Sequence, residues 1–104
     1  MANRLQQLQE FYESDPQDPF NIYALALEYL KVDTQKARTL FDELLSLHSE
    51  YLPTYYHAAK FFVESGEREL AIDTYEKGMA VAQKLNDQKA LRELKSAYDE
   101  LIFE

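Results

Sequence analysis

The sequence predicts an all-α protein of about six helices, and three observations support this prediction. The 104 residues include only 2 glycines and 3 prolines, too few for a meander of β-hairpins. Long stretches are rich in Ala, Leu, Glu, Lys and Gln, which have high helix propensities. Apolar side chains recur at the spacing i, i+3, i+4 and i+7, which places them on one face of a helix.

Composition and charge exclude several classes of function. The chain is one domain long, and its 46% apolar and 29% charged residues argue against disorder. The absence of cysteine excludes disulfides and thiolate sites. A net charge of −8, from 11 basic and 19 acidic residues, argues against binding to nucleic acid or to an anionic membrane surface. No apolar run resembles a signal peptide or a membrane span, so a cytoplasmic location is expected.

Short breaks divide the chain into its predicted helices. Asp18 can cap a helix that begins at Pro19, and Pro53 suits another helix start. Gly66 suits the left-handed residue that closes a helix, and Asn86 followed by Asp87 offers a stop and a cap. A further cap is expected at Asp33 or Thr34. The predicted helices cover residues 3–14, 19–31, 34–48, 52–65, 67–85 and 87–102.

The helices repeat in pairs with a period of about 34 residues. A shift of 34 places Ala37 on Ala71 and Phe41 on Tyr75. A shift of 33 superimposes the preceding helices, because one residue fewer occurs in the first turn. The superimposed pairs are Ile22 with Tyr55, Leu25 with Ala58, Ala26 with Ala59, and Tyr29 with Phe62. Two aligned pairs are difficult to obtain by coincidence in an ordinary six-helix bundle, so a repeat is the preferred interpretation.

This pattern resembles the tetratricopeptide repeat family, whose unit is a helix–turn–helix of 34 residues. Family units carry a Leu followed by a small residue and a Tyr on the first helix, and small and aromatic residues on the second. Leu25-Ala26 with Tyr29 matches the first helix, and Ala71 with Tyr75 matches the second. The resemblance implies antiparallel helix pairs that form a right-handed superhelix.

The resemblance extends over nearly the whole chain, which is expected to be one domain, 1–104. Asp15-Pro16 stands where a preceding unit would end, so the first helix is expected to be half of a unit, with Leu5, Leu8, Phe11 and Tyr12 on its apolar face. The last helix repeats the first-helix pattern through Leu91, Leu94 and Tyr98, and is expected to be a cap. The initial Met and this cap-like end favour a complete chain. The expected parts are a half-repeat at 3–16, repeats at 19–51 and 52–85, and a capping helix at 87–102.

Three departures and one glycine define this version of the repeat. Ile22 replaces the usual tryptophan of the family, Leu44 stands where the next unit has Gly78, and the closing Asp-Pro is absent after both full units. Glycine costs about 1 kcal/mol relative to alanine within a helix. Gly78 occupies a small-residue position of the repeat, so a close approach of two helices is expected there.

The resemblance implies that first helices line a concave groove, and the stripe beside their buried face is expected to bind a partner. The stripe comprises Phe20, Tyr23, Leu27 and Leu30 in the first repeat, Tyr56, Lys60 and Val63 in the second repeat, and Lys89 and Arg92 in the capping helix. Its first part is apolar, and its second part is expected to bring Lys60, Lys89 and Arg92 near one another. This suits a peptide with an apolar anchor near Tyr23 and Tyr56 and an acidic group near Lys60 and Arg92. Tyr23 and Leu27 occupy the places where some family members hold a carboxylate with Lys and Asn, so that clamp is not expected.

The predicted function is a non-enzymatic adaptor or scaffold that binds a peptide or protein segment. The alternative is a structural protein that forms a homodimer through the same apolar stripe. No cofactor or metal is expected, because His48 and His57 lack a carboxylate at ligand spacing and no glycine-rich phosphate loop occurs. No serine has the sequence context of a nucleophile.

Overall fold

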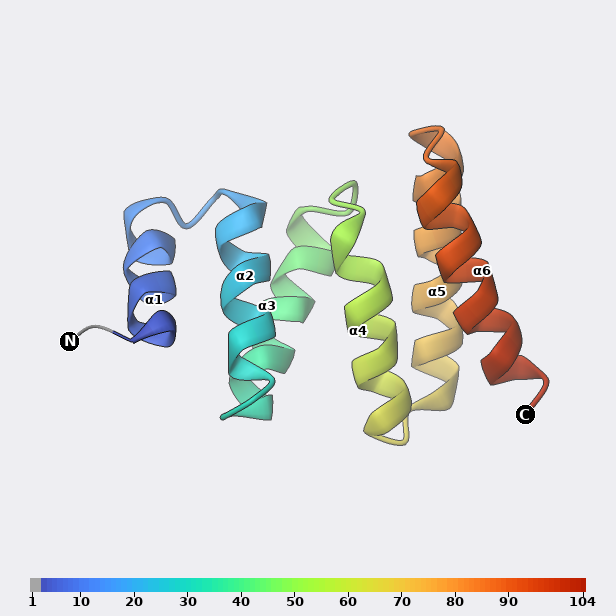
Figure 1. Cartoon of the computed structure of the whole chain (residues 1–104), viewed down its shortest axis with the longest axis horizontal. Helices are drawn as coiled ribbons and strands as arrows, with labels where there is room; N and C mark the ends of the chain where they lie inside the picture. The colour runs from blue at the N-terminus through green and yellow to red at the C-terminus, as the bar shows by residue number, and fades with distance from the viewer. Residues whose placement is uncertain (1–2) are drawn as a thin grey trace. The chain divides into compact units, whose positions relative to one another are not determined.

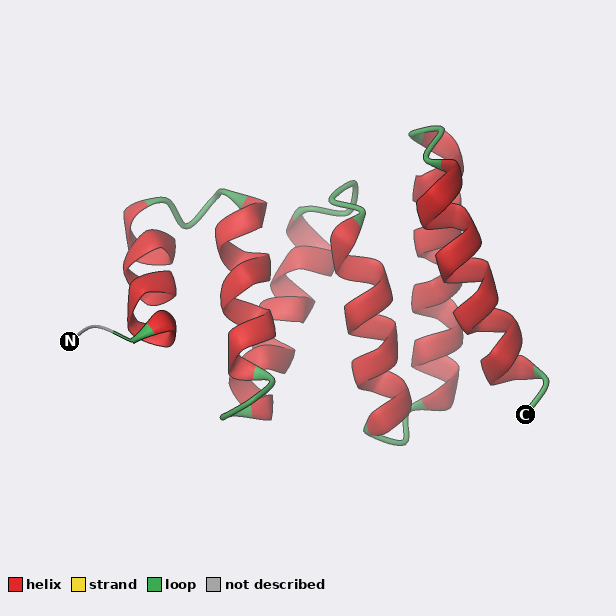
Figure 2. Ribbon diagram, viewed as in Figure 1, coloured by secondary structure: helices red, strands yellow, loops and turns green. Residues whose placement is uncertain are grey.

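The structure, a computed structural model, describes residues 3–104 and shows six helices joined by short turns (Figures 1 and 2). No strand occurs among these residues. The chain divides into two compact units, one up to Tyr51 and the other from Leu52 onward. The helices are α1 (Arg4–Ser14), α2 (Pro19–Tyr29) and α3 (Thr34–Leu47) in the first unit, and α4 (Pro53–Glu64), α5 (Arg68–Lys84) and α6 (Gln88–Ile102) in the second.

Side-chain caps begin three of these helices at residues that the sequence indicated. The Asp18 carboxylate accepts a hydrogen bond from the Phe20 N–H at 2.9 Å, and Pro19 occupies the first turn of α2. Asp33, rather than Thr34, caps α3, and Asp87 caps α6. Helix α2 ends at Tyr29, two residues before the expected end at 31, because the N–H groups of Lys31 and Val32 bond to carbonyls three residues back instead of four.

Left-handed residues close α4 and α5 with the same geometry. Gly66 has a φ of +78° and Asn86 a φ of +56°. The residue after each one donates its N–H to a carbonyl five residues earlier, from Glu67 to Phe62 and from Asp87 to Ala82, both at 2.9 Å. These are the bonds of a Schellman motif, which satisfies helix carbonyls that would otherwise lack a donor.

In the first unit, α2 packs against both α1 and α3. The predicted core face of α2, formed by Ile22, Leu25, Ala26 and Tyr29, is buried, and Ala37 and Phe41 of α3 are fully buried. Helix α1 is attached to α2 partly by polar contacts, including an ion pair of 3.5 Å between Arg4 and Glu28. The expected apolar face of α1 is partly wrong: Leu8 is buried, but 58% of Phe11 is exposed.

In the second unit, α5 packs between α4 and α6. The predicted core face of α4, formed by Tyr55, Ala58, Ala59 and Phe62, is buried, as are Ala71 and Tyr75 of α5. A Cβ on Gly78 would lie 2.6 Å from the Cβ of Tyr55, so a close approach of α4 and α5 explains this glycine. Helix α6 buries Leu94 as expected, and also Leu101.

Two buried threonines in the second unit differ in their hydrogen bonding. The Thr74 hydroxyl donates to the Leu70 carbonyl at 2.7 Å. Among the described residues, Thr54 Oγ1 is buried without a hydrogen-bond partner. A buried hydroxyl without a partner retains the cost of its lost hydration, about 1–3 kcal/mol.

We therefore expect opposite results from the same substitution at these two threonines. Thr54→Val should raise the free energy of unfolding by about 1 kcal/mol, because it removes a polar group that lacks a partner. Thr74→Val should lower it by about 1 kcal/mol, because it removes the hydrogen bond that the buried hydroxyl donates to the Leu70 carbonyl. Urea denaturation followed by circular dichroism measures both values, and a change of the same sign in both variants would contradict the assignment.

Candidate partner-binding surface

The predicted stripe of α2 includes one strongly exposed aromatic side chain. Phe20, in the first turn, is 58% exposed, whereas Tyr23, Leu27 and Leu30 are half-buried. Phe20 is therefore the side chain of this stripe with the largest fraction available to a partner.

Tyr23 is held by an aromatic contact that the sequence did not indicate. Its ring lies 5.7 Å from that of Tyr51, in an edge-to-face arrangement at 64°. Burial, followed by the proximity of Tyr51, raises the pKa of Tyr23 above its usual value. Tyr51 lies in the turn after α3, where helical periodicity gives no prediction, so this contact was missed.

The predicted residues of α4 are exposed and share one cavity. Tyr56 is 38% and Val63 36% exposed, and Lys60 is also exposed. A cavity of about 190 Å³ is lined by all three, together with Tyr75, Ala97, Glu100, Leu101 and Glu104. The structure therefore brings three of the predicted residues together around one cavity, which residues from the C-terminal half of α6 also line.

Lys89 and Arg92 do not line this cavity. They lie in the first two turns of α6, and Lys89 forms an ion pair of 4.0 Å with Glu93. At 1.5 Å per residue, Arg92 and Glu100 are separated by about 12 Å along the helix axis. The cavity thus places Lys60 among carboxylate residues, and the expected basic neighbours are elsewhere on α6.

His57 follows Tyr56 on α4, and the two rings lie 5.6 Å apart at 79°. Burial lowers the pKa of His57 from its usual value, and the positive charge of Lys60 lowers it further by a smaller amount. The imidazole is therefore neutral at pH 7. Within residues 3–104, no group of three or more His, Cys, Asp or Glu side chains could hold a metal ion.

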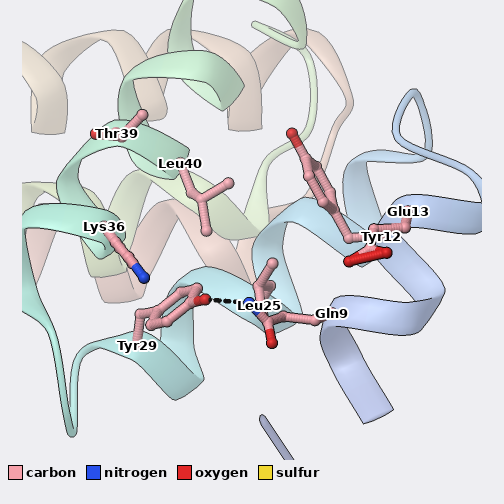
Figure 3. Close-up of a pocket in the computed structure, with 8 residues that line it drawn as sticks. All are labelled: Gln9, Tyr12, Glu13, Leu25, Tyr29, Lys36, Thr39 and Leu40. Atoms are coloured by element: carbon pink, nitrogen blue, oxygen red, sulfur yellow. Dashed lines mark hydrogen bonds between the residues drawn. The ribbon is translucent and has the colours of Figure 1, made fainter. Parts of the chain in front are cut away.

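A larger cavity of about 280 Å³ lies between α1, α2 and α3, away from the predicted stripe (Figure 3). Its polar groups mostly bond to each other or to the backbone. Gln9 donates to the Tyr29 hydroxyl at 2.6 Å, and Lys36 Nζ lies 5.4 Å from the centre of the Tyr29 ring. The Tyr12 hydroxyl donates to Glu43 at 3.3 Å. These contacts join α1 to the α2–α3 pair, so we interpret this cavity as part of the packing of the first unit.

Comparison with solved structures gives the family. The chain is similar to a tetratricopeptide repeat domain protein from Salinibacter ruber, whose solution structure shares 43% sequence identity with it. The alignment covers 84% of this chain and 89% of that one, with a TM-score of 0.79. The chain belongs to the tetratricopeptide repeat family. A crystal structure with the same description and source has 42% identity, coverage of 81% and 96%, and a TM-score of 0.77. No family model and no curated protein matches the chain.

Membership of the tetratricopeptide repeat family confirms the predicted all-α repeat fold. The family is generally a non-enzymatic fold for protein interaction, which suggests protein partners for this member. Across residues 3–104, none of the helices has the length and apolar character required to cross a bilayer.

Five residues around the cavity of this tetratricopeptide repeat protein were absent from the predicted stripe: Tyr75, Ala97, Glu100, Leu101 and Glu104. Leu101 could have been found, because it follows Leu94 by seven residues and Tyr98 by three, which continues the apolar period of α6. The two glutamates carry no such pattern, since charged residues occur on every solvated helix face.

Proposed function

We propose that this tetratricopeptide repeat protein is a non-enzymatic adaptor that binds a peptide or protein segment through the first helices of its repeats, the helices that line the concave groove in this family. The observation that supports the proposal is the exposure of Phe20 on α2 and of Tyr56 and Val63 on α4. Exposed aromatic residues are enriched at protein interfaces and often dominate their binding energy. Tyr56 and Val63 also border a cavity, which a partner side chain can enter.

The second helices provide a matched comparison. Leu47 on α3 is 65% exposed, and Leu70 on α5 is 38% exposed. Neither lines the described cavities. Lone exposed aliphatic residues are normal on protein surfaces, so these two leucines need no partner to explain them.

The two sets of residues define a test with an internal control. We expect the Phe20→Ala/Tyr56→Ala double variant to lose captured partners from native lysate by at least about tenfold, as removal of two aromatic anchors commonly does. The Leu47→Ala/Leu70→Ala variant should retain them. Quantitative mass spectrometry of the captured proteins, with circular dichroism to verify folding, measures the difference. Equal capture by both double variants would contradict the proposal.

Sedimentation velocity at several concentrations tests the alternative, a homodimer through the same side chains. A dimer that dissociates in the Phe20→Ala/Tyr56→Ala variant, but not in the leucine variant, would identify a second copy of the chain as the partner of these side chains. A monomer at all concentrations leaves them available to another protein.

A further inference from the structure

The cavity of the second unit has a buried apolar floor and a charged rim. Tyr75 and Leu101 are only 4% and 6% exposed and form the floor. Lys60, Glu100 and Glu104 are exposed and stand at the rim. The volume of about 190 Å³ is below the 300–1,000 Å³ typical of small-molecule pockets, and suits a single side chain.

The Tyr75 hydroxyl is the unusual group in this cavity. Its side chain is 96% buried, given an exposed fraction of 4%. Among residues 3–104 the hydroxyl has no hydrogen-bond partner, and yet it is not sealed from solvent as Thr54 Oγ1 is. The groups that act on it electrostatically are Tyr56 and Glu100, both of which line the cavity. Tyr75 lines the cavity, so a guest side chain can take the place of water at this hydroxyl.

We propose that this cavity binds the side chain of a lysine or arginine from the partner segment. This inference rests on the proposed function and identifies the chemistry that the second unit recognises. The methylene groups of such a side chain can pack against Val63, Ala97 and Leu101, while its cationic end reaches Glu100 and Glu104. The Tyr75 hydroxyl can accept one N–H of the cation, and the net charge of −8 attracts basic segments at longer range.

Replacement of Lys60 distinguishes a cationic guest from an acidic guest. Lys60 is the only basic residue among those that line the cavity. Glu100 and Glu104 also line it, so the formal charge of the lining is negative. Arg68 donates to the Leu101 carbonyl at 3.2 Å and does not line the cavity. A cationic guest should bind more tightly when Lys60 is neutralised. An acidic guest, which the sequence alone favoured, should bind more weakly.

The probes are acetylated and amidated peptides of the form Ala-Leu-X-Leu-Ala, in which X is arginine, lysine, citrulline or glutamate. Citrulline retains the shape of arginine and removes its charge. Titration followed by NMR should shift the signals of Ala97 and Leu101 with the arginine and lysine peptides, with at least about fivefold weaker binding of the citrulline peptide. Equal binding of the citrulline peptide, stronger binding of the glutamate peptide, or no shift at these residues would overturn the inference.

Variants of the protein complete the experiment. Glu100→Gln and Tyr75→Phe should each weaken the arginine peptide about threefold to fivefold, and Lys60→Gln should strengthen it. Glu93→Gln removes the same charge from α6 seven residues before Glu100, and should have little effect. If Lys60→Gln weakens binding of the arginine peptide, or if Glu93→Gln and Glu100→Gln weaken it equally, a cationic guest in this cavity is refuted.

Capture of natural partners separates this inference from the proposed function. If the Glu100→Gln variant retains its partners and the Phe20→Ala/Tyr56→Ala variant loses them, the adaptor function stands. The proposal that a lysine or arginine of the partner enters the cavity is then rejected. Partners retained by both variants would reject the adaptor surface, while the peptide titration would still decide what the cavity binds.

Discussion

Replacement of Gly78 by alanine is expected to lower the free energy of unfolding by about 2 kcal/mol, although alanine has the higher helix propensity. The added Cβ would lie 2.6 Å from the Cβ and 3.0 Å from the Cγ of Tyr55, and 3.3 Å from a terminal methyl of Leu94. The Cβ of Tyr55 is bonded directly to the backbone of α4, so it cannot rotate away. The clash is relieved only if α4 and α5 separate. Overpacking of this kind typically costs about 1–3 kcal/mol and occasionally more, which exceeds the gain of about 1 kcal/mol from propensity.

Urea denaturation followed by circular dichroism measures this loss, and Ala80→Gly is the control. Ala80 is exposed on the same helix, so the reverse change there should cost only the propensity difference of about 1 kcal/mol. Equal or greater stability of the Gly78→Ala protein would show that α4 and α5 do not approach closely at this point.

The parts of the fold that could be predicted are those determined by local chemistry or by period. Asp18, Asp33 and Asp87 act on N–H groups two or three residues away, so their capping role can be read from adjacent residues. The buried core faces of α2 and α4 follow from the spacing of apolar residues that is typical of any amphipathic helix. Gly78 could be interpreted because its cost within a helix requires compensation by packing.

The parts that could not be predicted depend on how one helix is placed against another. The sequence gives α1 four apolar residues on one face, but the position of α1 on α2 determines that Leu8 is buried and Phe11 is exposed. Lys60 was expected near Lys89 and Arg92. The alignment of α4 with the C-terminal half of α6 instead places Lys60 beside Glu100 and Glu104, and an alignment of helices has no signature in either sequence alone.

The second large effect is expected at Phe41, the largest side chain of the first unit that is fully buried. Phe41→Ala should lower the free energy of unfolding by about 3–5 kcal/mol, because the removed ring leaves a cavity that the surrounding helices only partly fill. Because the protein contains two compact units, the transition of the first unit should be followed separately, by fluorescence of Tyr23→Trp introduced into the wild-type and variant chains alike.

The control for Phe41 is Phe11, which the sequence assigned to the apolar face of the first helix. Its side chain is 58% exposed, so Phe11→Ala should cost no more than about 1 kcal/mol in the same assay. The identical substitution at two phenylalanines of one unit therefore separates the effect of burial from that of residue type. A loss at Phe11 as large as that at Phe41 would mean that Phe11 is covered in solution, by a second copy of the chain or by a different placement of α1. The exposed face of α1 would then have to be counted as core or as interface.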